Sequence, residues 1–439
     1  PFLSPAMRLL PLFLCSAALA CSAFAADLDW PAVTSQTKPW SRWWWLGSIS
    51  TEEGLRSEMK KYADAGLGGL EITPIYGVHG YEKQFINYLS PTWVDRLSFV
   101  LKEAKQLGMG IDMATGNGWP FGGTWVDDAD AAKYLAHESF TVAAGERLAV
   151  PVAMMQKEIL SFAGATTVPI TAIKRPISSN ENLQELALNQ VRFPEPLPLK
   201  VLMAFPSQGG GTPVDLTSRV GADGKLDWTA PAEGGTWTLH AVFTGLHGKM
   251  VERAGPVGEG NVIDHFSSDS LRKYLKKFDD AFAGRDVGGL RGFFNDSYEV
   301  DDASGESNFT PKFFEEFQRR RGYDLRVQLP ALFTTEASEI SSRVVSDYRE
   351  TVSDLLLDEF TTPWRRWAES RGSITRNQAH GSPANIIDLY AASSIPEQEG
   401  SDRIAMKLAS SAAHVTGKRL ASAEAATWLN EHFIGTLAE

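Results

Sequence analysis

Apolar residues in the first third of the chain alternate between short continuous runs and rows at helical spacing. The continuous runs are typical of buried strands and lie at 42–47, 69–72 and 109–114. Two segments with helical spacing, 51–65 and 90–106, lie between them. The second begins with Ser90-Pro91, a helix cap followed by proline in the first turn. Strands and helices that alternate with short connections predict a parallel sheet.

The pattern changes between about Glu138 and Arg253, where helical spacing fades. The run 236–243 alternates in the manner of a half-buried strand, and Asp223-Gly224 is a hairpin signal. Proline, glycine, threonine and valine are frequent throughout this stretch. These features predict a β-rich, sandwich-like domain inserted into a loop of the parallel-sheet domain.

Helix and strand patterns alternate again after the insert. Helices are expected at 269–282, 311–321, 338–369 and 402–415, and strands at 289–298, 373–380 and 419–424. Because helices directly follow strands, an α/β fold with a (β/α)8 TIM-like barrel is the leading architecture, and an open doubly wound sheet is the alternative. Only six or seven barrel strands precede Glu439, so we expect a barrel that is incomplete at its C-terminal side. The expected parts are a signal peptide at 7–25, the first barrel part at 38–137, the insert at 138–253 and the second, truncated barrel part at 254–439.

The N-terminal segment predicts export. Met7-Arg8 gives a positive start, residues 9–26 are uncharged, and Ala23-Phe24-Ala25 is an A-x-A cleavage pattern, as in bacterial signal peptides. A membrane anchor, or a lipid anchor at Cys21, is the alternative. Both cysteines, Cys15 and Cys21, lie in this segment, so the exported chain is expected to lack disulfides, cysteine–zinc sites and cysteine nucleophiles. We expect a periplasmic or extracellular protein with no membrane span after cleavage.

The charge balance argues against nucleic-acid binding. The 439 residues carry 54 acidic and 42 basic side chains, a formal net charge of −12, without a basic cluster that interleaves aromatic residues. G-x-S-x-G and H-E-x-x-H motifs are missing, as is a G-x-G-x-x-G after the first strand. The histidines are scattered, which leaves an oxygen-ligated ion such as Ca²⁺ as the conceivable metal. The 13 Trp and 10 Tyr residues are compatible with stacking on sugars.

Carboxylates gather where the expected strands of the second barrel part end. TIM barrels carry their chemistry at the C-terminal ends of the strands. Acidic groups lie at the ends of two expected strands, at 295–299 and 422–424, and a third group, at 395–399, comes after the strand 373–380. Glycoside cleavage uses a protonated acid for the leaving oxygen and an ionised partner for water or the anomeric carbon. Helix caps or solvated loops are the alternative interpretation of each of these side chains.

Other polar clusters suit a sugar cleft. The glycine-rich segment 116–123 would let backbone approach a ligand on which its tryptophan stacks, although a tight turn is the alternative. A second cluster lies where the insert rejoins the barrel, and a turn with a helix cap is its alternative. The tryptophans of 43–45 must alternate between the barrel interior and an exposed rim. Candidate substrate-binding residues here are Asn117, Trp119, Asp264, His265 and Trp45.

Taken together, these segments resemble glycoside hydrolase family 106, the α-L-rhamnosidases of bacterial glycan degradation. The similar motifs are ordered over about residues 38–430 and comprise Arg42–Trp45, Glu52–Ile72, Gly118–Gly123, Asp296–Glu299, Phe314–Asp324, Gln378–Gly381, Ile395–Glu399 and Ser422–Glu424. The resemblance implies a barrel with β-rich accessory domains. It also implies an inverting, calcium-assisted attack on terminal α-L-rhamnosides.

The resemblance implies roles for single residues. Glu299, in Asp-Ser-Tyr-Glu, would be the general acid, and Glu424, in Ser-Ala-Glu, would be the base that activates water. Glu399, or its neighbour Glu397, would be a third essential carboxylate that touches the calcium or the sugar hydroxyls. Further candidate substrate-binding residues in the same motifs are Asp296, His380 and Glu397.

We therefore expect an exported, inverting α-L-rhamnosidase whose substrate is a rhamnose-containing oligo- or polysaccharide of plants or microbes. Inversion requires acid and base carboxyl groups ~6.5–9.5 Å apart, against ~5–5.5 Å for retention. Two alternatives stay open: a barrel glycoside hydrolase with another sugar specificity, and a truncated, non-catalytic carbohydrate-binding protein. Family members are usually longer, so the chain is expected to be a fragment.

Overall fold

The computed structural model describes residues 32–163, 166–175, 187–208, 211–300, 303–399 and 403–424. The expected signal peptide, with Cys15 and Cys21, lies outside these ranges. Within them, no helix has both the length and the apolar character needed to cross a membrane.

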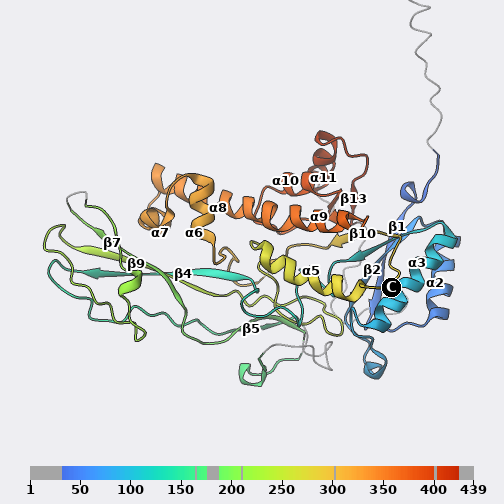
Figure 1. Cartoon of the computed structure of the whole chain (residues 1–439), viewed down its shortest axis with the longest axis horizontal. Coiled ribbons are helices and arrows are strands. Elements are labelled where there is room, and N and C mark those ends of the chain that lie inside the picture. The colour runs from blue at the N-terminus through green and yellow to red at the C-terminus, as the bar shows by residue number, and fades with distance from the viewer. Residues whose placement is uncertain are drawn as a thin grey trace, which may run out of the picture.

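Seven parallel strands form the sheet that organises the molecule (Figure 1). Their spatial order is β1-β2-β3-β10-β11-β12-β13, the same as their order along the chain. The strands are β1 (Trp40–Leu46), β2 (Gly69–Ile75), β3 (Gly110–Ala114), β10 (Leu290–Asn295), β11 (Ile374–Asn377), β12 (Ile395–Gln398) and β13 (Ser422–Ala423). The insert occupies the long connection between β3 and β10, which are direct neighbours in the sheet.

The parallel sheet curls into a half barrel. Arg42 on the outer strand β1 lies 3.1 Å from Glu424, which directly follows the opposite outer strand, β13. A flat, doubly wound sheet would hold these two edges far apart. The expected α/β architecture is therefore confirmed as a barrel-like curl, whereas a complete eight-stranded barrel is not seen in the part of the chain that the structure describes.

Helices alternate with the parallel strands. They are α2 (Glu52–Asp64), α3 (Pro91–Leu107), α5 (Ser268–Phe282), α6 (Phe313–Arg321), α7 (Leu329–Phe333), α8 (Glu339–Leu355), α9 (Thr362–Ser370), α10 (Ile386–Ala392) and α11 (Arg403–Val415). Short 3-10 turns lie at Ser35–Thr37, Glu82–Gln84, Ile170–Ala172, Thr217–Arg219 and Leu325–Gln328. The α3 boundaries follow from local chemistry: Ser90 accepts the Trp93 N–H at 3.3 Å, and Gly108 ends the helix with φ of 67°.

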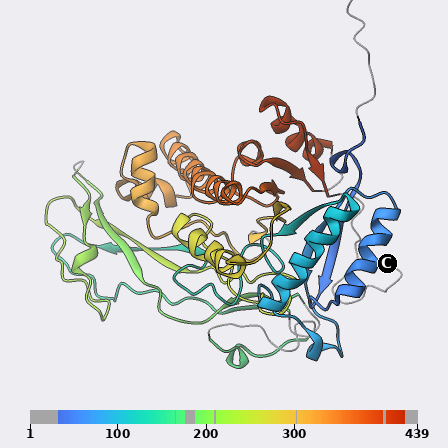
Figure 2. The ribbon, with the colours of Figure 1, turned by 45° about the vertical axis from the view of Figure 1, so that its right-hand side comes forward.

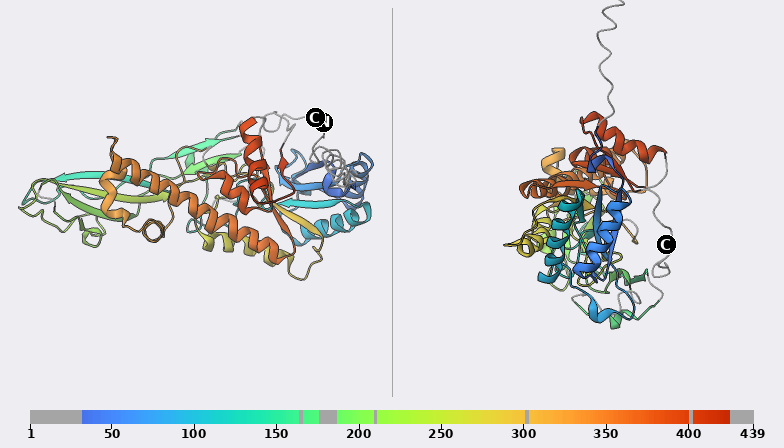
Figure 3. Two further views of the ribbon diagram at one scale, coloured as in Figure 1. Left: turned by 90° about the horizontal axis from the view of Figure 1, so that it is seen from above. Right: turned by 90° about the vertical axis from the view of Figure 1, so that its right-hand side faces the viewer.

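One long helix was expected at 338–369, and the structure interrupts it. A π-helical turn, Leu356–Thr361, joins α8 to α9. Pro363 lies in the first turn of α9 and has no N–H to donate, so a regular i→i−4 ladder cannot run through this point. The run borders the parallel sheet at α9 and extends toward the insert at α8 (Figure 3).

The described residues of the insert form two separate antiparallel sheets, which lie to one side of the parallel sheet (Figure 2). The larger has the order β4-β9-β7-β8 and the smaller pairs β5 with β6. Their strands are β4 (Lys133–Val142), β9 (Trp237–Leu246), β7 (Leu199–Pro206), β8 (Val214–Asp215), β5 (Ile159–Phe162) and β6 (Leu188–Arg192). Strand β4 begins before the expected boundary at 138, because Lys133 already pairs with Leu246 of β9.

Candidate active site

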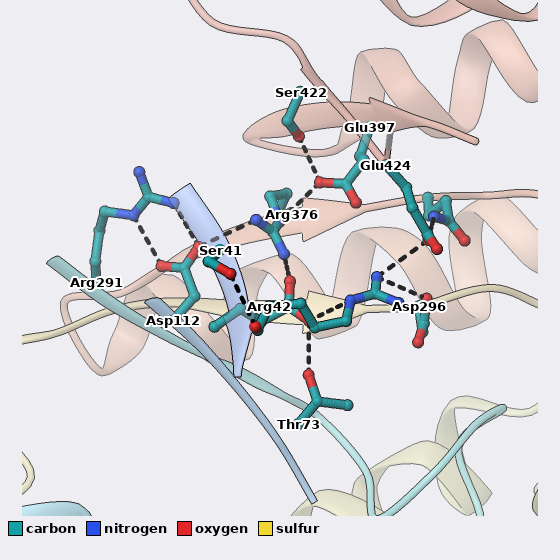
Figure 4. Close-up of polar contacts among 12 residues, drawn as sticks. Ser41, Arg42, Thr73, Asp112, Arg291, Asp296, Arg376, Glu397, Ser422 and Glu424 are labelled. Carbon is teal, nitrogen blue, oxygen red and sulfur yellow. Dashed lines mark hydrogen bonds and ion pairs between the residues drawn. The ribbon is translucent and has the colours of Figure 1, made fainter. Parts of the chain in front are cut away.

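An ionic network fills the interior of the curled sheet (Figure 4). Every strand contributes, either from within or from the residue directly after it. The members are Arg42 (β1), Glu71 (β2), Asp112 (β3), Arg291 and Asp296 (β10), Arg376 (β11), Glu397 (β12) and Glu424 (β13). The network therefore depends on the arrangement of all seven strands, because its members come from segments far apart in the sequence.

Strand register explains the first row of this network. Arg42 is paired with Glu71, and Glu71 with Asp112, across β1, β2 and β3. Residues in register on neighbouring parallel strands point to the same face. Their charged side chains therefore lie side by side on the inner face, although all three strands are otherwise largely apolar.

Arg291 and Arg376 neutralise the deeper carboxylates. Arg291 Nε donates to Asp112 Oδ1 at 2.8 Å, and Arg376 Nε lies 3.0 Å from Glu397 Oε2. Arg376 also pairs with Glu71. Burial raises the pKa of Asp112, and the adjacent Arg291 opposes that effect.

Arg42 carries the network up to the rim. Its Nε lies 3.2 Å from Glu71 Oε1, and its Nη2 lies 3.2 Å from Asp296 Oδ1 and 3.1 Å from Glu424 Oε2. Gln378 Nε2 donates to the same Glu424 oxygen at 2.6 Å. The predicted base is thus held by two donors, one from β1 and one just beyond β11.

Asp296 lies at the centre of the rim carboxylates. Burial raises its pKa to about 7, the nearby charges of Glu424, Glu299 and Glu397 act in the same direction, and Arg42 opposes them. Three of the four carboxylates that the sequence singled out for catalysis or metal binding therefore act electrostatically on one buried aspartate. Such differences in environment allow neighbouring carboxyl groups to hold different protonation states.

Glu299, the predicted acid, is held from two sides. Trp119 Nε1 donates to Glu299 Oε2 at 2.7 Å, and Ser297 Oγ donates to Oε1 at 2.8 Å. Glu299 has φ of 34°, an unfavourable value for a residue with a side chain. Arg253 lies over the Trp119 ring, 5.2 Å from its centroid. Such strained residues are common in active sites, where surrounding contacts impose the conformation.

Glu399 and His380 lie near one another at the rim. His380 Nδ1 is 3.7 Å from Glu399 Oε2, and its side chain is 54% exposed. The His380 carbonyl accepts the Tyr298 N–H at 2.9 Å, which ties this loop to the loop that carries Glu299. The structure thus brings both predicted residues to the edge of the same region.

The remaining candidate substrate-binding residues are buried. Trp45 packs on Trp43 and Trp93, with ring centroids 5.7 and 5.6 Å away. Asn117 connects the glycine-rich loop to the chain at 255–256 by accepting from Gly255 N and donating to Pro256 O. In these positions they support the fold around the site, and their predicted contact with a sugar stays a prediction.

Asp264 and His265 are also enclosed. Asp264 accepts from Thr310 Oγ1 at 2.7 Å, and burial raises its pKa to about 6. Burial lowers the pKa of His265 to about 3, so this ring is neutral at physiological pH. It packs against Tyr298 and Phe360, and through Tyr298 it lies beside the loop of the predicted acid.

The sequence did not single out the arginines and the deeper carboxylates as site residues. A signal was present, because Glu71 and Asp112 are charged residues inside short apolar runs that read as buried strands. Burying a charge is costly without a partner. Such a residue therefore predicts a partner of opposite charge, but not which strand supplies it.

The described residues do not assemble a calcium site around the predicted ligands. Among them, no group of three or more acidic, histidine or cysteine side chains could hold a metal. Glu397 is engaged by Arg376 and by Ser422 Oγ at 2.6 Å, whereas Ca²⁺ takes about 6–8 oxygen ligands. The calcium requirement stays a prediction.

Comparison with known proteins gives three findings. The sequence profile of a glycoside hydrolase family, Glyco_hydro_106, described as alpha-L-rhamnosidase, matches residues 31–194 and 211–438. The solved structure of a rhamnosidase from Novosphingobium sp. PP1Y is similar with a TM-score of 0.65 and 23% identity, over 90% of this chain and 52% of that one. This likeness supports the fold.

A curated protein of Formosa agariphila, provisionally named a beta-glucuronidase, is 24% identical over 410 residues. The match covers 90% of this chain and 34% of the relative. The chain thus spans about half of the solved neighbour and a third of the curated relative.

Proposed function

This chain belongs to the glycoside hydrolase 106 family of α-L-rhamnosidases, and on that premise we propose that it releases terminal α-L-rhamnose from glycans with inversion at the anomeric carbon. The observation that carries the proposal is that Arg42 joins Glu424 to Asp296 at the rim of the curled sheet, where the loop that begins at Asp296 also holds Glu299. Two carboxyl groups in different surroundings are what acid–base glycoside cleavage requires.

Glu424 suits the base. Arg42 and Gln378 both donate to its Oε2, and hydrogen bonds to the charged form favour an ionised carboxylate. An ionised Glu424 accepts a proton from water as the water oxygen attacks the anomeric carbon. The glycosidic C–O bond breaks on the opposite face of the sugar.

Glu299 suits the acid. Its proton passes to the departing glycosidic oxygen, so one proton enters the site on water and one leaves on the alcohol product. The Ser297 hydroxyl can donate to the carboxylate or accept from the carboxylic acid, because it has both capacities. That contact therefore supports Glu299 in both protonation states.

Three further parts of the proposal rest on the sequence. Residues 7–25 would direct export to the periplasm or beyond. Ca²⁺ would assist the reaction, as the family resemblance implies. The substrate would be a rhamnose-containing oligo- or polysaccharide. A different sugar is the second candidate, favoured by the glucuronidase name of the Formosa relative.

The test is rhamnose release from an aryl α-L-rhamnoside, with the anomer of the first product identified by NMR. Release of the β-anomer would support inversion. We expect Glu299→Gln and Glu424→Gln each to lower kcat by about 10²–10⁴-fold, the usual contribution of one general acid or base. Glu306→Gln, an exposed glutamate in the loop after Glu299, is the matched control and should retain activity.

The same assay separates the alternatives. Hydrolysis of an aryl β-glucuronide but not of the rhamnoside would contradict the proposed sugar specificity, while the proposed roles of Glu299 and Glu424 would remain. Sugar binding without any turnover would favour a non-catalytic protein. Activity that EDTA abolishes and Ca²⁺ restores would support the metal, whereas activity indifferent to EDTA would discard it.

A further inference from the structure

A single guanidinium group contacts three carboxylates from three other strands. Arg42 reaches Glu71 through Nε at 3.2 Å, and it reaches Asp296 and Glu424 through Nη2 at 3.2 and 3.1 Å (Figure 4). Its side chain is only 16% exposed. A guanidinium can make such contacts together because its donors lie in one plane in a fixed fork.

Arg42 is itself held in place. Glu71 lies opposite it in the strand register and is fixed in turn by Thr73 Oγ1, which donates at 2.7 Å. The ring of Phe294 lies below the guanidinium, 5.3 Å away, and the ring of Trp44 is 5.2 Å away. The side chain therefore presents its outer nitrogen to the rim in a defined position.

The charges around Arg42 explain why its position affects the neighbouring carboxylates. The charged groups that face Arg42 or Asp296 from the packed elements are Glu71, Asp296, Glu299, Arg376, Glu397 and Glu424. Carboxylates outnumber guanidiniums in this set even with Arg42 present. Without Arg42, Asp296 and Glu424 would face each other with no cation between them.

We propose that Arg42 is a positioning residue that orients Glu424 and keeps it ionised beside Asp296. The inference rests on the proposed function, because it gives Arg42 a role in supporting Glu424 as the general base. Arg42 acts through carboxylates of the protein and needs no contact with the sugar. When Glu424 takes the proton from water, Arg42 keeps its ion pair with Glu71.

The decisive comparison is between two arginines of the same network. Arg291 matches Arg42 closely: its side chain is 19% exposed, it pairs with a buried carboxylate, and it lies over a tryptophan ring. Its partner is Asp112 at the deep end, away from Glu424. Arg291→Gln therefore controls for the structural loss of a network arginine.

We expect Arg42→Gln to move the acidic limb of the kcat/KM profile upward by about one pH unit or more, as the loss of a contacting cation predicts. At pH values on the acidic limb, the kcat/KM of Arg42→Gln should be about tenfold below that of the wild type. The difference should shrink as pH rises. Arg42→Lys keeps the charge without the fork and should shift the limb less. Arg291→Gln should lower the melting temperature and leave the limb unchanged.

A second readout needs no catalysis. The side-chain carboxyl of Asp296 can be followed by ¹³C NMR during a pH titration, with Asp296→Asn used to assign its signal. Its titration midpoint should rise in Arg42→Gln, and in smaller degree in Arg42→Lys, but not in Arg291→Gln. If the wild-type chain cleaves no rhamnoside, the proposed function fails, and this titration still decides what Arg42 does.

Two results would overturn the inference. One is a folded Arg42 variant whose activity drops equally at all pH values and whose Asp296 titration is unchanged. The other is an equal shift in Arg42→Gln and Arg291→Gln, because a purely structural network would respond to the loss of either arginine.

Discussion

Asp296 shows, at the scale of a single residue, how burial works against a charge. Its pKa is raised to about 7, chiefly by burial, whereas an aspartate in an unfolded chain titrates near ~3.9. The folded state therefore holds the Asp296 proton more tightly than the unfolded state between these pH values. Linkage then requires the contribution of Asp296 to stability to fall as pH rises from about 4 to about 7.

Asp296→Asn should remove this pH dependence. At pH 5 the variant should be only moderately more stable than the wild type, because Asp296 is still protonated in the folded wild type and is ionised only in the unfolded chain. At pH 8 the variant should gain stability relative to the wild type, because it has no buried charge to accommodate. The measurement is the free energy of unfolding in urea at both pH values.

Asp286→Asn, at an exposed aspartate in the loop before β10, controls for the general loss of a negative charge. A difference between Asp296→Asn and the wild type that stays constant from pH 5 to pH 8 would contradict the expectation. It would mean that Arg42 fully offsets the burial of Asp296.

At the scale of elements, neighbouring strands must leave space for the buried charged side chains. Gly292 of β10 lies opposite Asp112 in the register. A Cβ atom there would lie 3.0 Å from Asp112 Oδ1 and 3.3 Å from Cγ1 of Ile374. The glycine therefore leaves the space that the Asp112 carboxylate occupies beside Arg291.

Gly292→Ala should destabilise the protein by about 1–3 kcal/mol, the usual cost of overpacking a core. Asp112 cannot move away freely, because it is fully buried and paired with Arg291. The free energy of unfolding from urea titration is the measurement. Gly288→Ala is the control, since a Cβ there would meet only Asp286 Oδ1 at 3.6 Å. Equal stability of the two variants would show that β10 can shift to accommodate the added methyl group without a loss in the free energy of unfolding.

The insert holds the loop that follows the predicted acid, which is a feature of the whole molecule. Gln190 of β6 donates to Ser304 O at 3.1 Å and accepts from Ser304 N at 2.9 Å. Arg192 Nη2 donates to the same carbonyl at 3.0 Å, and His247 Nε2 lies 2.8 Å from Gly305 O. A domain far from the barrel strands in sequence thus fixes the chain shortly after Glu299.

Gln190→Leu should loosen this loop and lower kcat/KM on the rhamnoside severalfold. Amide hydrogen exchange across 303–309 should quicken at the same time, which provides a readout independent of catalysis. Gln156→Leu is the matched control: Gln156 is equally buried and bonds to Phe193 O and Tyr134 within the insert. Equal effects of both substitutions on the loop would show that general destabilisation of the insert is responsible.

The sequence predicted elements well where local chemistry defines them. The helix expected at 90–106 is α3, because a serine cap and a left-handed glycine lie at its ends. The early start of β4 at Lys133 and the helix α10 were not predicted, since their boundaries depend on pairing and packing with distant segments. The π-helical turn before α9 was also not predicted, because the spacing of apolar residues in a helix does not reveal one extra residue in a single turn.

By itself, the sequence determined the α/β alternation, the β-rich insert and the family motifs that carry Glu299 and Glu424. These features depend on hydrophobic period, capping residues and short motifs, all of which are written in local order along the chain. Only the tertiary structure decided that Arg42 of β1 meets Glu424 after β13. That contact arises from the curl of the sheet and the register of its strands, and both are set by packing among residues hundreds of positions apart.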